Sequence, residues 1–147
     1  MPLFIYSVYL FLSVFNAGNM TTLQLQHYNI YPFVGKDAFQ RYMQANNKAA
    51  LIPSILPALL LLVANIGLLF FRPRFMSMQG ALLSLLLNIV ALMSTFVWQR
   101  KIQADMAVLG YDEAKVKRLV STNWVRTIAF LVQAILSVSF IIHAVSS

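Results

Sequence analysis

The stretch AALIPSILPALLLLVANIGLLFF, residues 49–71, contains no charged side chain and lies between Lys48 and Arg72. Its 23 residues exceed the about 20 that an α-helix needs to cross the hydrocarbon core of a bilayer. A soluble domain carries about 25% charged residues, whereas this chain carries 10% and is 60% hydrophobic. The segment and the composition together predict an integral membrane protein and exclude an ordinary soluble globular domain.

Three further runs of the chain have the same character. Residues 75–99 form an uncharged run, no charge precedes Lys36, and residues 119–147 are interrupted only by Arg126. Because unpaired backbone groups are costly in lipid, each run is expected to be a helix. The sequence therefore predicts an all-α integral membrane protein made of a single domain, residues 1–147. Its four transmembrane spans are expected at about 3–26, 49–71, 76–99 and 119–145.

We expect these spans to form an up-down-up-down four-helix bundle. Asp37 is the expected N-cap of a helix that continues to the end of the second span, with kinks at Pro53 and Pro57. Gly110 is expected to end the third helix, and Asp112 to cap the fourth. The helices then outrun the bilayer and protrude from it on one side.

The basic residues are distributed unevenly around the spans. The side that holds both termini has Arg72 and Arg74. The other side has eight basic residues, namely Lys36, Arg41, Lys48, Arg100, Lys101, Lys115, Lys117 and Arg118. The positive-inside rule places these eight in the cytoplasm and the termini outside, in a multi-pass membrane protein. The net charge of +7 then suits anionic lipid headgroups and gives no reason to expect a nucleic-acid partner.

Arg126 is the charged residue inside a predicted span, where a charge costs at least about 2.5–3.5 kcal/mol. Asn123, Thr127 and Gln133 share one face of the helix with it, so this polar face is expected to contact protein. Two interpretations remain open: Arg126 binds an anionic or phenolic oxygen inside the bundle, or it extends to the interface or caps backbone carbonyls. The candidate ligand-binding residues are Arg126, Asn123, Thr127, Trp124, Asn88 and Gln99.

Two other features of the spans bear on the function. Asn65 and Asn88 lie deep in the second and third helices, where hydrogen bonding between helices is favoured over a ligand site. All four helices also become more polar toward the basic side. This gradient indicates either a water-accessible vestibule or the ordinary composition of a membrane interface.

Metal and cofactor chemistry find little support in the sequence. The chain has no Cys, and no predicted span contains its acidic residues, which are Asp37, Asp105, Asp112 and Glu113. Its two histidines, His27 and His143, are expected to lie a full span apart. We therefore expect no metal site and no cofactor. Whether the protein is an enzyme stays open, with His27 and Tyr31 as the candidate catalytic groups.

Two stretches carry a resemblance to a known family. The first is QLQHYNIYPFVG at residues 24–35, followed by Phe39 and Tyr42; the second includes LVSTNWVRT at residues 119–127, preceded by Ser94-Thr95-Phe96, Gln99 and Gly110-Tyr111-Asp112. This order resembles a bacterial four-helix membrane family of unknown function that is grouped with the fungal anthrone oxygenases. The resemblance covers roughly residues 16–135. It implies four membrane helices, a location in the bacterial inner membrane, and oxidation of a flat, lipophilic phenolic substrate.

The sequence departs from that family at its histidines. Where the family has a Tyr-His-x-x-His arrangement, this chain has Tyr42, Met43 and Asn46. Where the family has a Gln-x-Pro-x-His segment, the chain has Gln99 to Gln103 without His. A metal or proton-transfer role of those histidines would therefore not apply here, whereas the Asn-Trp-x-Arg-Thr segment that contains Arg126 is retained.

Two functions remain open at this stage. In the first, a lipophilic ligand (a phenol, a quinone or a lipid) binds between the helices near Arg126. In the second, the chain is a non-catalytic accessory subunit of a larger membrane complex, or a homo-oligomer, with its exposed helix faces as contact surfaces. A channel or transporter is a third hypothesis. No repeat between the two halves of the sequence supports it.

Overall fold

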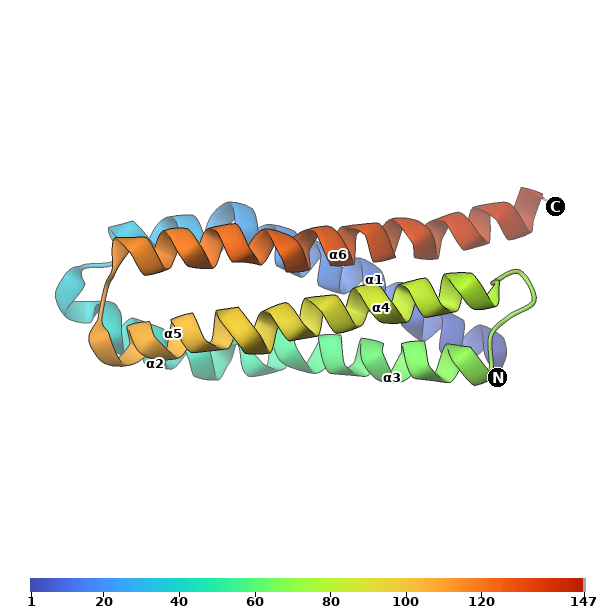
Figure 1. The fold of residues 1–147 in the computed structure, drawn as a ribbon, viewed down its shortest axis with the longest axis horizontal. Helices are drawn as coiled ribbons and strands as arrows, with labels where there is room; N and C mark the ends of the chain where they lie inside the picture. The colour runs from blue at the N-terminus through green and yellow to red at the C-terminus, as the bar shows by residue number, and fades with distance from the viewer. Residues whose placement is uncertain (147) are drawn as a thin grey trace.

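Helices make up nearly all of the chain. The computed structural model describes residues 1–146, and these contain no strand. Four helical segments are long and apolar enough to cross a membrane, namely Pro2–Phe33, Leu51–Phe70, Met78–Leu109 and Glu113–Ser146. Figure 1 shows them lying lengthwise beside one another. The predicted helical class and the four membrane-length helices are thus confirmed.

Three of these segments change their helical type along their length. The first consists of α1 (Pro2–Thr22), the π-helical turn η1 (Leu23–His27) and the 3₁₀ helix η2 (Tyr28–Phe33). After α2 (Lys36–Ala49), the second consists of the π-helical turn η3 (Leu51–Ile55) and α3 (Leu56–Phe70). The third consists of α4 (Met78–Ser94), the π-helical turn η4 (Thr95–Gln99) and α5 (Arg100–Leu109). The last segment is the continuous helix α6 (Glu113–Ser146).

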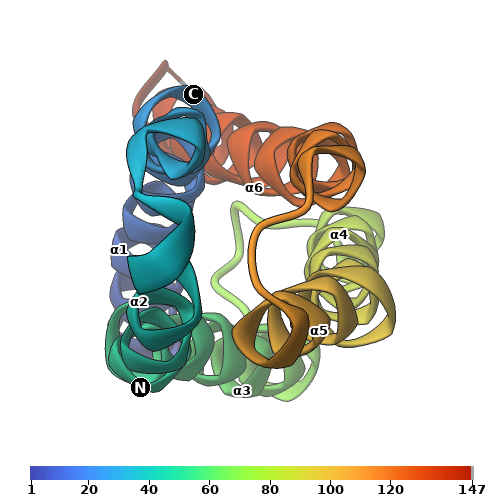
Figure 2. The same cartoon turned by 90° about the vertical axis from the view of Figure 1, so that its left-hand side faces the viewer.

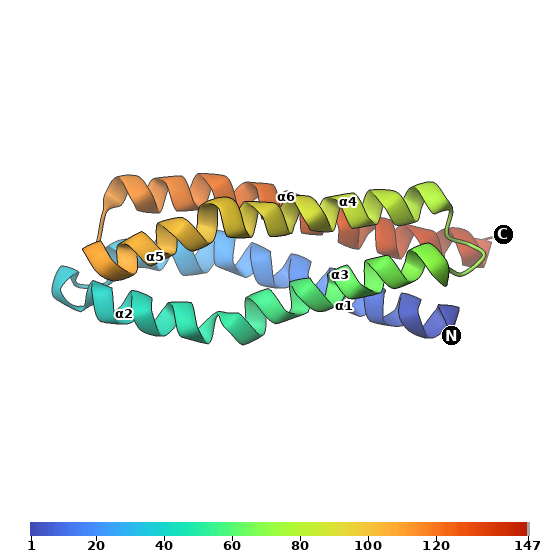
Figure 3. The ribbon, with the colours of Figure 1, turned by 60° about the horizontal axis from the view of Figure 1, so that its bottom comes forward.

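The long helices surround a common axis. α1 packs against α3 and α6, and α4 packs against the same two helices. Figure 2, which looks along the long axis, shows the four helices around the interior. The N-terminus and the C-terminal end of α6 lie at one end of the molecule, and α2 and α5 lie at the other, as Figure 3 shows.

The pair formed by α2 and α5 is held by amide side chains. Gln40 Nε2 donates to the Val108 carbonyl at 2.6 Å, and Gln44 Nε2 donates to the Ala107 carbonyl at 3.2 Å. Because the last carbonyls of a helix lack partners within it, these bonds satisfy the C-terminal end of α5. These bonds hold α2 and α5 together at the end of the molecule where the sequence predicts that helices protrude from the bilayer.

The distribution of buried and exposed side chains is the one expected of membrane helices. Small and aromatic residues such as Tyr9, Ala64 and Ala91 are buried between the helices, whereas large apolar residues such as Phe11 and Ile135 are exposed. A water-soluble protein rarely exposes so continuous an apolar surface. This arrangement favours a membrane protein.

The start of α2 and the break after it differ from the prediction. Asp37 is not an N-cap: α2 begins at Lys36 after Gly35, and no side chain caps it. Asp37 lies in the first turn instead, where a negative charge still favours the positive end of the helix. The prolines break the predicted single helix more strongly than a kink would, since Pro53 lies inside η3 and Pro57 lies in the first turn of α3.

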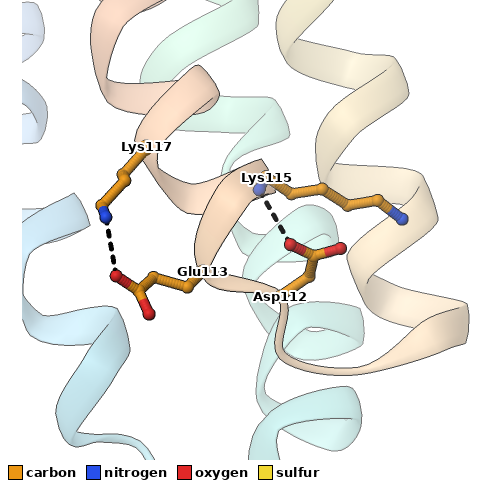
Figure 4. Close-up of polar contacts among 4 residues, drawn as sticks. All are labelled: Asp112, Glu113, Lys115 and Lys117. Carbon is orange, nitrogen blue, oxygen red and sulfur yellow. Dashed lines mark hydrogen bonds and ion pairs between the residues drawn. The ribbon is translucent and has the colours of Figure 1, made fainter.

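The turn between α5 and α6 agrees with the prediction. Gly110 ends α5 with a φ of 88°, a left-handed conformation that favours glycine. Asp112 accepts a hydrogen bond at 3.0 Å from the backbone N–H of Lys115, which makes it the N-cap of α6 (Figure 4). Figure 4 also shows the exposed ion pair between Glu113 and Lys117, one turn into the helix.

Candidate functional site

Arg126 lies inside the bundle and bonds to side chains from two other segments. It is 5% exposed. Its Nε donates to Asn123 Oδ1 at 2.6 Å, its Nη2 donates to the Tyr28 hydroxyl at 2.9 Å, and its Nη1 approaches Thr95 Oγ1 at 3.4 Å. These partners are all side chains, so the guanidinium group lies inside the bundle and caps no backbone carbonyl among the described residues. This position suits the first of the two interpretations, and binding of a ligand oxygen by Arg126 stays a prediction.

Asn123 and Gln24 hold the guanidinium group in place. Asn123 Nδ2 donates to Gln24 Oε1 at 2.6 Å, and Gln24 Nε2 donates to the Val120 carbonyl at 3.2 Å. Thr127 donates to the Asn123 carbonyl at 3.1 Å. Asn123 therefore holds Arg126 by a hydrogen bond, and Thr127 holds Asn123. Neither Asn123 nor Thr127 lines the cavity described next.

A small cavity of about 40 Å³ lies beside the guanidinium group, between all four segments. Its lining residues are Leu23, His27, Tyr28, Asn46, Ala50, Ser54, Ile55, Thr95, Gln99, Arg100, Gln103 and Arg126. A cavity needs about 10–15 Å³ to hold one water molecule. The cavity thus has room for a hydroxyl group, a small ion or a few waters, and it is too small for an aromatic ring.

All three π-helical turns contribute to this cavity. η1 provides His27, η3 provides Ser54, and η4 provides Thr95 and Gln99. π-Helical turns are rare and occur frequently at functional sites. Each one takes an extra residue in a turn, which shifts the side chains that follow relative to the α-helical period. The cavity therefore lies where three separate helices depart from regular geometry.

The charges around the cavity are not balanced by the chain. Arg100 and Arg126 both line it, and none of the lining residues is acidic. Within residues 1–146, the ion pair between a basic and an acidic side chain is that of Lys117 with Glu113, at 2.7 Å on the surface. A guanidinium group keeps its charge in proteins, and a buried charge is costly without a partner. The cavity therefore favours an anionic or electron-rich oxygen.

Gln99, which lines the same cavity, has an amide oxygen without a hydrogen-bond partner within residues 1–146. Its Nε2 donates to Thr122 Oγ1 at 2.7 Å and to the Leu119 carbonyl at 3.3 Å. Its Oε1 is buried and has no hydrogen-bond partner among the described residues. A buried polar atom without a partner costs about 1–3 kcal/mol. A group that donates a hydrogen bond to Gln99 would remove this cost.

The two candidate catalytic groups lie together, but only one reaches the cavity. His27 lines it, and its Nε2 lies 3.0 Å from Asn46 Oδ1. Asn46 Nδ2 donates to the Tyr31 hydroxyl at 3.3 Å, and Tyr31 is buried away from the cavity. Tyr42 packs edge-on against Tyr31 with ring centres 5.7 Å apart, and burial raises the pKa of the Tyr42 phenol.

Of the remaining candidates, one lies at the cavity and two lie elsewhere. Gln99 is at the cavity, but Trp124 points outward and is 44% exposed. Asn88 lies deeper in the bundle, where its Oδ1 accepts a hydrogen bond from Asn65 Nδ2 at 3.4 Å, and Gln133 Nε2 donates to Asn65 Oδ1 at the same distance. The structure thus brings Gln99 and His27 beside Arg126, and it separates Trp124 and Asn88 from it.

Several residues at the site were not among the candidates that the sequence predicts. Gln24 and Tyr28, four positions apart on the first segment, reach Asn123 and Arg126. Their helical spacing with His27 was a signal that one face of this segment is polar. Thr95 and Arg100 lack such a signal, because the π-helical turn η4 changes the direction of the side chains there.

The chain matches no family model, no curated protein and no solved structure. The resemblance to the family grouped with anthrone oxygenases therefore stays a prediction.

Proposed function

We propose that the chain is a four-helix, multi-pass protein of the bacterial inner membrane that binds a lipophilic molecule through an anionic or phenolic oxygen at Arg126. In this proposal the four long helices cross the membrane as an up-down-up-down bundle. The end with α2 and α5 lies in the cytoplasm, because it carries most of the basic residues, and the two termini lie outside.

The observation that carries the proposal is a cavity that is lined by two arginines, one of them the buried Arg126, and by no carboxylate. Arg126 is buried at a depth where the chain offers it only neutral partners. Neutral partners stabilise a buried charge less than an opposite charge does. A ligand that brings an anionic or readily polarised oxygen supplies what the chain lacks.

The hydrogen-bond pattern favours a hydroxyl-bearing ligand within this class. Arg126 already donates to a phenol, that of Tyr28. Gln99 Oε1, on the other hand, requires a donor. A phenolic hydroxyl both accepts and donates a hydrogen bond, whereas a quinone carbonyl only accepts. The site therefore fits a phenol better than a quinone.

His27 is the group at the cavity that could take a proton from such a ligand. The amide oxygen of Asn46 accepts from His27 Nε2, which leaves Nδ1 as the basic atom of a neutral ring. We include this proton transfer in the proposal as the step that would follow binding. It needs no metal or cofactor.

The test uses the full chain in lipid nanodiscs and compares naphthol with naphthalene, which lacks the hydroxyl group. We expect the wild-type protein to bind naphthol more tightly than naphthalene, relative to empty nanodiscs. Arg126→Gln should lower the naphthol affinity by at least about tenfold, because a hydrogen bond to a charged group contributes about 1.5–3 kcal/mol. Naphthalene binding should not change.

Arg118→Gln is the matched control, since Arg118 is an exposed arginine on the same helix. It should leave both affinities unchanged. Equal naphthol binding by wild type and a folded Arg126→Gln variant would overturn the proposal.

A second candidate function is that of an accessory subunit in a membrane complex or homo-oligomer. The observation in its favour is an apolar groove of about 620 Å³ between α1 and α3, lined by residues that include Phe4, Phe11, Val63 and Gly67. Its exposed side chains, such as Phe4 and Val63, offer an apolar surface to a further helix.

Native mass spectrometry after gentle extraction separates the two functions. A stoichiometric assembly with other polypeptides, or with further copies of this chain, would favour the subunit. A lone chain with a bound small molecule, lost in Arg126→Gln, would favour the ligand-binding protein.

A further inference from the structure

The cavity beside Arg126 is too small for the ligand that its chemistry selects. Its volume of about 40 Å³ admits a hydroxyl group but no ring. The body of a phenolic ligand must therefore lie outside this cavity, next to it. The structure offers one neighbouring space whose wall is shared with the cavity.

That space is an outer groove between η2 and the start of α6. Its lining includes Tyr28, Pro32, Tyr111, Val116, Val120 and Trp124. Its volume is about 640 Å³, within the about 300–1,000 Å³ of ordinary small-molecule pockets. Aromatic and aliphatic side chains dominate these walls, and Glu113 and Lys117 at the rim neutralise each other. The outer groove thus suits a flat apolar body without a net charge.

Tyr28 is the residue that lines both spaces. It is 1% exposed, and its hydroxyl accepts the hydrogen bond of Arg126 Nη2 at 2.9 Å. Its ring therefore separates the outer groove from the guanidinium group. Its phenol also occupies one of the donor positions that a phenolic ligand would use.

We infer that the outer groove is the binding site for the aromatic body of the ligand, and that the Tyr28 phenol is a built-in substitute which the ligand hydroxyl displaces from Arg126. The ligand is a lipophilic phenol that enters from the membrane interface beside Trp124. No covalent bond changes in this exchange, because one phenolic oxygen replaces another on Arg126 Nη2. This inference rests on the proposed function and adds the ligand's position, its entry side and the competing residue.

The two tryptophans of the chain supply a matched pair of reporters. Trp124 lines the outer groove and is 44% exposed, whereas Trp98 in η4 does not line it and is 39% exposed. In Trp98→Phe, where Trp124 is the remaining fluorophore, we expect saturable quenching by naphthol in nanodiscs. In Trp124→Phe, Trp98 should show only the quenching that follows from partition of naphthol into lipid.

The displacement is tested by removing the competing hydroxyl. Tyr28→Phe removes the hydroxyl that bonds the ring to Arg126. The ring that separates the groove from the guanidinium group is then displaced at lower cost, so the naphthol affinity should rise by about tenfold. Naphthalene affinity should not change. Tyr42→Phe is the control, because Tyr42 lines neither the groove nor the cavity and is not bonded to Arg126; it should leave the naphthol affinity unchanged.

The outcomes separate this inference from the proposed function. Naphthol binding that depends on Arg126, without saturable quenching of Trp124 or without a gain in Tyr28→Phe, would overturn the inference and leave the proposed function intact. Binding that shows no dependence on Arg126 would overturn both. Should Tyr28→Phe fail to fold, Val120→Phe, which fills the groove, must weaken naphthol binding at least fivefold, or the groove is not the site.

Discussion

Two buried polar clusters lie between the same helices and differ in charge and in backbone geometry. The Arg126 cluster, made of Arg126, Asn123, Gln24 and Tyr28, carries a positive charge and borders a cavity formed at three π-helical turns. The amide cluster, made of Asn65, Asn88 and Gln133, is neutral and lies on the regular helices α3, α4 and α6. We interpret the amide cluster as an assembly element and the Arg126 cluster as a site.

The comparison shows which feature marks a site in a membrane bundle. An amide oxygen without a hydrogen-bond partner occurs in both clusters, at Gln99 and at Gln133, so this feature alone is not diagnostic. The buried charge without an acidic partner, the cavity and the interrupted helices occur together only in the first. Neutral amides that bond between helices stabilise the bundle, whereas an isolated charge opposes folding and therefore indicates a function.

The largest stability effect is expected in the amide cluster. Asn65→Leu removes a side chain that donates to Asn88 and accepts from Gln133, and both amides lose a partner. The free energy of unfolding should fall by about 1–3 kcal/mol, the cost of leaving buried polar groups unsatisfied. Unfolding in mixed micelles, followed by far-UV circular dichroism, measures this change, and the naphthol affinity of the folded variant should equal that of wild type.

The control is the triple variant in which Asn65, Asn88 and Gln133 are all replaced by Leu. It leaves no amide of the cluster without a partner, so it should lose less stability than Asn65→Leu alone. A larger loss in the triple variant would contradict the interpretation of these residues as a bonded unit.

A substitution outside both clusters should have an intermediate effect on the free energy of unfolding. Asp112→Ala removes the side chain that accepts from the Lys115 N–H at the start of α6. Loss of an N-cap typically lowers the free energy of unfolding by about 1 kcal/mol. The same unfolding assay measures it, and naphthol binding serves as the check that the interior is unchanged. A loss above that of Asn65→Leu would mean that this end of the molecule, and not the amide cluster, limits stability.

The smallest change in stability is expected at Arg126. A large change there would contradict the comparison of the two clusters most directly. Arg126→Met loses three hydrogen bonds but also removes a buried charge that has no acidic partner. Replacing buried ionic groups by apolar residues is often neutral or stabilising, so the free energy of unfolding should change by less than about 1 kcal/mol. Naphthol binding should nevertheless be lost. If the variant is instead less stable than Asn65→Leu, Arg126 serves the fold.

Local properties of the sequence predicted a large part of this molecule. The four membrane-length helices follow from uncharged runs, because the need to pair backbone groups in lipid acts within each segment. The inward direction of Asn123, Arg126, Thr127 and Gln133 follows from the helical period of α6, which has no π-helical turn. Gly110 and Asp112 were also predicted, because a helix end depends on neighbouring residues. The N-cap at Asp37 was wrong, since α2 begins at Lys36 and its N-cap position is Gly35, two residues earlier.

The composition of the site depended on contacts that no local pattern contains. Tyr28 and Arg126 are 98 positions apart, and Gln24 and Asn123 are 99 apart, so their meeting depends on how α1 and α6 are packed lengthwise. Trp124 belonged to the predicted site by its neighbours in sequence, but the helix turns it outward to the outer groove.

The sequence by itself thus determined the helices, their membrane character and the polar face around Arg126, because periodicity and hydrophobicity act over a few turns. The tertiary structure alone decided which side chains share the cavity, since the three π-helical turns shift the side chains of their helices away from the regular period. It also decided that Tyr28 stands between the cavity and the outer groove. The physical reason is that packing of distant segments sets such contacts, and packing is a property of the whole bundle.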